Sequence, residues 1–121
     1  RWAIRSPTPT LATAASECAR AGASTVLVCC TAASLTRDYV AALATTGARV
    51  GAYANAGRLD EGIGWGASGG AERYAALATS WVEAGARIVG SCCGTGPAHV
   101  AAVSALARPV RPSRDPSPRS G

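Results

Sequence analysis

The sequence lacks lysine, methionine and phenylalanine, and only six of its 121 residues are aromatic. No apolar run approaches the roughly 18 to 20 residues that a membrane-spanning helix needs, so we expect no membrane segment. The formal charge of +5 comes from twelve arginines against seven acids, and four of the arginines lie in residues 108–121. The rest of the chain shows no clustered basic face with interleaved aromatics, so we expect no nucleic-acid partner.

Small side chains take the place of the missing large ones. Alanine occurs 28 times and glycine 14 times, which together is about a third of the chain. A core of Ala, Val and Leu fills little volume per residue. This favours one small domain of closely packed helices and strands, or a piece of something larger.

The five cysteines are an odd number, and no secretory signal precedes them. The chain begins with Arg1-Trp2-Ala3, without an initiator methionine, so we expect it to start within a longer, cytoplasmic protein. These features argue against a disulfide framework. They leave thiolate chemistry, metal binding or buried structural thiols.

A Gly-Ala step followed by a β-rich run occurs three times, at residues 21–30, 46–55 and 84–93. The glycine of each step suits the left-handed position that closes a helix. Eight residues after these glycines stand Cys30, Asn55 and Cys93, which therefore occupy the same place in the repeat. We expect all three at the carboxyl ends of strands.

The segments between these runs carry apolar residues at helical spacings of three and four. We expect four helices. The first covers residues 9–21, the second begins after Ser34 as its N-cap, the third begins at Glu72, and the fourth begins at Pro97. One helix followed by three strand–helix units predicts an α/β fold with a parallel sheet covered by helices. A doubly wound sheet and a (β/α)8 barrel both fit, and both bind ligands at the carboxyl ends of their strands.

Two segments fall outside this alternation. Residues 57–70 are rich in glycine and predict a long loop after the second strand. Residues 108–121 hold four of the seven prolines together with Ser and Arg, and predict a disordered tail.

The strand-end cysteines can form a metal site. Strands two apart in a barrel aim side chains at the same interior layer, so Cys30 and Cys93 can approach one another. Cys92 can join them only if the chain bends, and Gly94 supplies the freedom to bend. Three thiolates with an open fourth position describe a catalytic zinc, which suits methyl transfer to a thiol substrate. The alternative is that each cysteine is a small buried apolar residue.

The segment from Gly94 to His99 follows a strand and opens a helix, as a dinucleotide-binding turn does. His99 replaces its third glycine, and Pro97 removes a backbone donor, so this signal is weak. His99 is also a possible zinc ligand by type. We expect it instead on the helix surface or in support of the ligands.

Three motifs resemble, in order, those of the homocysteine S-methyltransferase family. The family's strands end in Asn-Cys-Thr, Pro-Asn-Ala/Ser-Gly and Gly-Gly-Cys-Cys-Gly-Thr. The motifs here are Val28-Cys29-Cys30-Thr31, Tyr53-Ala54-Asn55-Ala56-Gly57 and Gly90-Ser91-Cys92-Cys93-Gly94-Thr95-Gly96-Pro97-Ala98-His99. The resemblance implies that residues 1–107 are the C-terminal part, about three βα units, of a homocysteine-binding (β/α)8 barrel. The family's asparagine before the first ligand is Cys29 here, and its second glycine is Ser91.

The resemblance further implies that Cys30, Cys92 and Cys93 hold Zn²⁺, with Asn55 at the substrate pocket. The implied reaction is methyl transfer from a sulfonium donor, S-methylmethionine or S-adenosylmethionine, to homocysteine, giving methionine. The family's N-terminal half, with its Asp-Gly-Gly motif and homocysteine-binding acids, is absent from this sequence. Two alternatives therefore stay open: an inactive barrel fragment that at most binds metal through its thiolates, and an α/β cofactor-binding domain.

Overall fold

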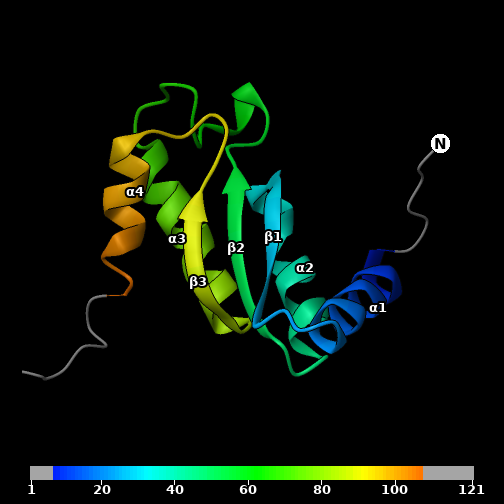
Figure 1. The fold of residues 1–121 in the computed structure, drawn as a ribbon. Coiled ribbons are helices and arrows are strands. Elements are labelled where there is room, and N and C mark those ends of the chain that lie inside the picture. The colour runs from blue at the N-terminus through cyan, green and yellow to red at the C-terminus, as the bar shows by residue number, and fades with distance from the viewer. Residues whose placement is uncertain (1–6, 108–121) are drawn as a thin grey trace, which may run out of the picture.

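The computed structural model describes residues 7–107, and within them helices and strands alternate as predicted (Figure 1). The elements are α1 (Pro7–Arg20), β1 (Thr25–Ala32), α2 (Ala33–Ala44), β2 (Arg49–Asn55), the 3-10 turn η1 (Leu59–Glu61), α3 (Gly70–Glu83), β3 (Ala86–Ser91) and α4 (Pro97–Ser104). The predicted tail, residues 108–121, lies outside the described residues. Within the described range, no helix has both the length and the apolar character needed to cross a bilayer.

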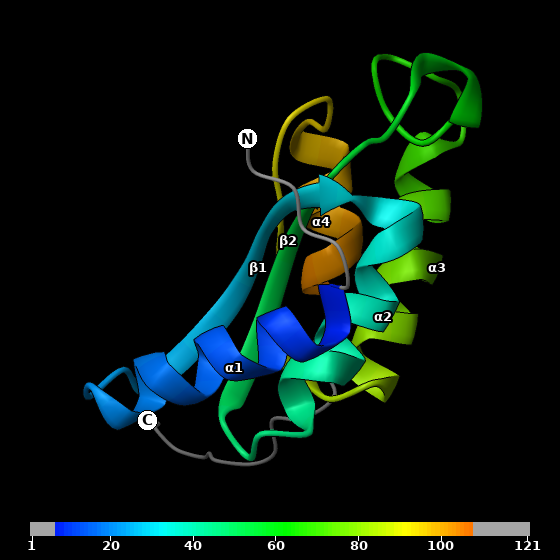
Figure 2. The ribbon, with the colours of Figure 1, turned by 90° about the vertical axis from the view of Figure 1, so that its right-hand side faces the viewer.

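The three strands form one parallel sheet in the order β1-β2-β3. Helices α2 and α3 cover one face of this sheet, while α1 packs against α2 and α4 packs against α3 and β3 (Figure 1 and Figure 2). No described helix covers the opposite face. The α/β prediction is confirmed, and an open sheet covered on one side is consistent with a fragment of a barrel.

The core lies between the sheet and its helices and consists mainly of small side chains. Val28 and Val50 are buried on the helix-covered face of the strands. The two large exceptions are Tyr74 and Trp81 on α3, which are fully buried and pack edge to face with ring centroids 5.4 Å apart. The alanine-rich composition thus produces a thin core centred on two aromatic rings.

The other face of the sheet exposes apolar side chains. Leu27, Gly51 and Ile88 are aligned across the three strands, and Leu27 and Ile88 are 39% and 44% exposed. A Cβ at Gly51 would lie 2.8 Å from the Ile88 Cβ, so position 51 must be glycine for Leu27 and Ile88 to pack over it. In a closed barrel this face would be the interior.

Helix α2 begins differently from the prediction. Strand β1 continues to Ala32 and the helix starts at the next residue, so Ala32 is the N-cap and no side chain caps the helix. The prediction of Ser34 as N-cap is wrong because β1 extends past Cys30 to pair Ala32 with Asn55. The predicted helix start at Pro97 is confirmed.

Candidate metal centre

Strand β1 is interrupted at Cys30 by a β-bulge. Cys29 pairs with Tyr53 and Ala32 pairs with Asn55, so β1 has one more residue than β2 between these pairs. Cys30 adopts φ 52°, a left-handed conformation that costs a residue with a Cβ about 1–2 kcal/mol. The bulge breaks the strict alternation of side chains at the end of the strand, so Cys30 does not have to face the helices.

Strand β3 is followed by a tight turn that begins at Cys92. The Cys92 N–H donates to the Ala54 carbonyl at 3.1 Å, and the Thr95 N–H closes the turn on the Cys92 carbonyl at 3.2 Å. Gly94 has φ 81° in this turn, a conformation for which glycine is favoured. The bend that the sequence required is therefore present, and Cys92 and Cys93 both reach the cluster.

The turn is held from outside by the glycine-rich loop. The Trp65 N–H donates to the Gly94 carbonyl at 2.7 Å, and its indole Nε1 donates to the Gly57 carbonyl at 3.0 Å. A Cβ at Gly94 would lie 2.6 Å from the Trp65 indole. Residue 94 must therefore be glycine both for its φ angle and for this close contact.

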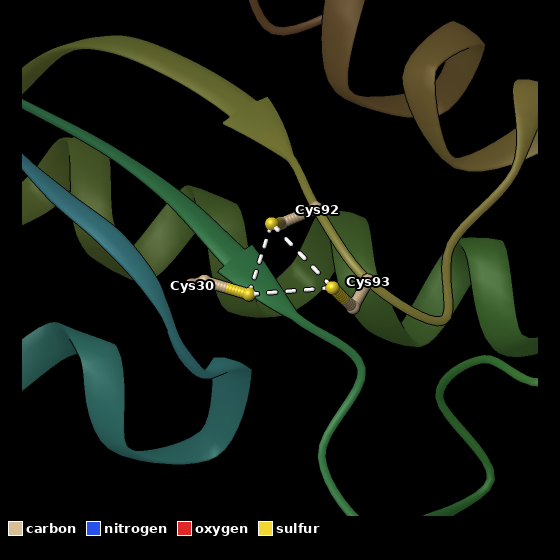
Figure 3. A group of neighbouring side chains, drawn as sticks. All are labelled: Cys30, Cys92 and Cys93. Carbon is tan, nitrogen blue, oxygen red and sulfur yellow. Dashed lines mark hydrogen bonds between the residues drawn. The ribbon is translucent and has the colours of Figure 1, made fainter.

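The three sulfur atoms converge at the carboxyl end of the sheet (Figure 3). The Sγ–Sγ distances are 2.9 Å for Cys30–Cys92, 3.6 Å for Cys30–Cys93 and 3.9 Å for Cys92–Cys93. Tetrahedral zinc with bonds of about 2.3 Å needs sulfurs about 3.8 Å apart. Two of the three distances fit, and the third needs an opening of about 0.9 Å to reach this spacing. The cluster could therefore hold a metal ion.

The thiols of Cys30 and Cys92 differ in pKa. The Cys92 thiol donates a hydrogen bond to the Cys30 sulfur, and this bond is the main reason that the pKa of Cys30 falls from 9.0 to about 7. The Cys93 backbone N–H lowers the same pKa further. The same thiol–thiol bond raises the pKa of Cys92 to about 11. One thiolate, at Cys30, thus forms near neutral pH before any metal arrives.

Asn55 lies beside this cluster, where the sequence placed it. Its Nδ2 donates to the Cys30 carbonyl at 2.7 Å and lies 3.8 Å from the Cys30 sulfur, while its Oδ1 accepts from the Gly57 N–H at 2.8 Å. Thr31 adds a second restraint, because its hydroxyl lies 2.6 Å from that of the buried Thr36. Since the Thr36 hydroxyl donates to the Ala32 carbonyl, Thr31 is the donor of this pair.

The contribution of Tyr74 to the site was missed from the sequence, which marked it only as part of a buried helix face. Its hydroxyl lies 2.6 Å from the Ala54 carbonyl and 2.9 Å from the Gly90 carbonyl, so it joins the ends of β2 and β3 beneath the cysteines. Burial raises the pKa of this hydroxyl, which keeps it protonated as a donor. No local signal in the sequence marks this role.

His99 and Cys29 lie outside the three-thiol group among the described residues. Of the two places expected for His99, the helix surface is wrong, because the residue is buried. Its Nδ1 accepts from the Gly96 N–H at 3.1 Å, and its Nε2 lies 2.7 Å from the Ile63 carbonyl. The Gly96 N–H is therefore not free for a phosphate, which weakens the dinucleotide interpretation. Cys29 is exposed and pairs with Tyr53 on the open face of the sheet.

Fold and site together define an α/β protein with a candidate thiolate metal centre at the carboxyl ends of its parallel strands. The chain belongs to the homocysteine S-methyltransferase family, because the family model "Homocysteine S-methyltransferase" matches residues 4–107. It is similar to "Homocysteine S-methyltransferase YbgG" of Bacillus subtilis (strain 168), with 40% identity over 47 residues. That alignment covers 39% of this chain and 15% of the relative. No solved structure matches.

Proposed function

We propose that residues 1–107 form the C-terminal part of a homocysteine-binding barrel in which Cys30, Cys92 and Cys93 hold Zn²⁺. The proposed reaction is methyl transfer from a sulfonium donor, S-methylmethionine or S-adenosylmethionine, to homocysteine. The convergence of the three sulfurs within 4.8 Å carries the proposal, and the family of the chain supports it.

The residues of the chain would contribute binding and orientation. The Cys30 thiolate, which forms near pH 7, would provide the first ligand, and Cys92 and Cys93 would complete a set of three sulfur ligands. Bound zinc supplies a Lewis acid that keeps a substrate thiol deprotonated. The homocysteine sulfur then forms a bond to the methyl carbon as the donor's carbon–sulfonium bond breaks. The donor leaves as a neutral thioether.

The substrate pocket would open on the same rim of the sheet. Asn55 stands there beside Cys30, and the loop that carries Trp65 lies against the turn after Cys93. We assign Asn55 to this pocket because its side chain is only partly buried next to the cluster.

Metal analysis of the chain tests the zinc site. We expect about one zinc per chain by mass spectrometry of the purified protein, and a loss of most of it in Cys92→Ala. Cys18→Ala is the matched control, since Cys18 is an exposed cysteine of α1 outside the cluster, and it should retain zinc. Unchanged zinc in Cys92→Ala would contradict the proposal.

The open face of the sheet favours a second candidate, a thiolate metal binder without turnover. Leu27 and Ile88 are exposed on that face, and β1 and β3 are edge strands among the described elements. Methionine formation from homocysteine and either donor distinguishes the two candidates. Turnover that is lost in Cys92→Ala but kept in Cys18→Ala supports methyl transfer, whereas stoichiometric zinc without turnover supports the second candidate.

A further inference from the structure

The position of the Cys30 sulfur depends on an unusual backbone conformation. Cys30 has φ 52° inside the bulge, and this conformation directs its Sγ to within 2.9 Å of Cys92 and 3.6 Å of Cys93. A regular strand would send neighbouring side chains to opposite faces of the sheet. Something must therefore hold the bulge in place when the cluster forms.

Asn55 is placed to do this from the neighbouring strand. Its Nδ2 donates to the Cys30 carbonyl at 2.7 Å, the peptide group that directly follows the left-handed residue. Its Oδ1 accepts from the Gly57 N–H at 2.8 Å, which fixes the orientation of the amide. Both ends of the side chain therefore bond to backbone groups, and its N–H donor bonds to the bulge.

We propose that Asn55 is a positioning residue that holds Cys30 in its left-handed conformation, so that its sulfur meets those of Cys92 and Cys93. The metal in this inference comes from the proposed function, whereas the hydrogen bonds of Asn55 are present without a metal. It differs from a substrate-pocket role because the partner of the amide N–H is the Cys30 carbonyl.

Cobalt binding by the 121-residue chain gives the first test. Co²⁺ reports thiolate ligands through its charge-transfer absorption, and competition with Zn²⁺ gives the zinc affinity. We expect Asn55→Ala to weaken binding by about 10- to 100-fold, the usual effect of losing a group that orients a ligand. The charge-transfer intensity per bound cobalt should fall as well, because Cys30 no longer reaches the ion.

Thr46→Ala is the matched control, and Thr46 lies in the turn that precedes β2. The Thr46 hydroxyl donates to the Leu43 carbonyl at 2.7 Å and accepts from the Ala48 N–H at 3.3 Å, the same pair of backbone bonds that Asn55 makes. A purely structural loss should affect both variants alike. Zinc affinity and cobalt spectrum should stay at the wild-type values in Thr46→Ala, and the same result in Asn55→Ala would overturn the proposal.

A metal-free measurement separates this inference from the proposed function. In EDTA, diamide accepts the two electrons and two protons released when the Cys30 and Cys92 thiols join, and peptide mapping measures the cross-link. The Cys93→Ser background removes the competing thiol, and Cys30→Ser identifies the cross-linked peptide.

We expect the cross-link to form about tenfold more slowly with Asn55→Ala than without it, and at an unchanged rate with Thr46→Ala. Equal rates with and without Asn55→Ala would overturn the positioning role. If the wild-type chain binds neither Co²⁺ nor Zn²⁺ but Asn55→Ala still slows the cross-link, the metal proposal fails and the positioning role stands.

Discussion

Replacing Tyr74 by phenylalanine removes a single hydroxyl from the centre of the fold. That hydroxyl lies 2.6 Å from the Ala54 carbonyl and 2.9 Å from the Gly90 carbonyl, and so connects β2 to β3 just below the cysteines. The phenylalanine ring would keep the edge-to-face contacts with Trp81 and His99. No cavity larger than one oxygen atom results, so the effect reports the hydrogen bond itself.

The expected loss of stability depends on which hydrogen-bond donors each carbonyl retains. One hydroxyl proton serves two acceptors, so a single hydrogen bond of about 0.5–1.5 kcal/mol is lost. The Ala54 carbonyl still accepts from the Cys92 N–H at 3.1 Å, and the Gly90 carbonyl still accepts from the Ala54 N–H in the parallel ladder between β2 and β3. Neither carbonyl is left unsatisfied, so we expect Tyr74→Phe to lower the free energy of unfolding by about 0.5–1.5 kcal/mol.

Urea and thermal unfolding followed by circular dichroism measure this change. For about 100 ordered residues, the expected loss corresponds to a fall in Tm of about 2–12 °C. Tyr39→Phe is the matched control, because no described residue hydrogen-bonds the Tyr39 hydroxyl, which should make its effect smaller than about 0.5 kcal/mol. Equal stability of the two variants would refute the claim that the Tyr74 hydroxyl holds the strands together.

Two further predictions concern the turn and the thiols. Gly94→Ala should destabilise the protein by about 1–3 kcal/mol, since it combines a left-handed φ with a clash against Trp65. Gly66 also has a positive φ, but a Cβ there would meet open space, so Gly66→Ala is the control. If denaturant titration finds equal losses of stability in the two variants, the clash with Trp65 does not contribute. In the metal-free chain, initial rates of alkylation by iodoacetamide, measured while Cys30 is still largely unmodified, should reach half their maximum near pH 7 for Cys30 and near pH 11 for Cys92. Alkylation midpoints near pH 9 for both thiols would contradict the hydrogen bond from the Cys92 thiol to the Cys30 sulfur. The stabilisation of the fold that is linked to the Cys30 thiolate grows as the pH rises from about 7 to 9 and is lost below pH 7.

The order of elements and the edge of the sheet at which the cysteines lie could be predicted from the sequence. Periodicity of apolar residues and the recurring Gly-Ala step are local signals, and they placed Cys30, Asn55 and Cys93 at equivalent ends of parallel strands. The need for a bend near Cys92, with Gly94 to permit it, was also visible, because side chains on a regular strand alternate. The structure contains that bend.

The local signals did not predict how the cysteines are aimed and supported. The left-handed bulge at Cys30, the Asn55 amide on its carbonyl and the Tyr74 hydroxyl between two strands all join residues far apart in the chain. His99 illustrates the same difference, since its buried ring bonds a carbonyl 36 residues away instead of facing solvent. Helix and strand patterns arise from neighbouring residues, so the sequence by itself determined the elements and the set of candidate ligands. The direction of each side chain depends on hydrogen bonds and packing across the sheet, and only the tertiary structure decided it.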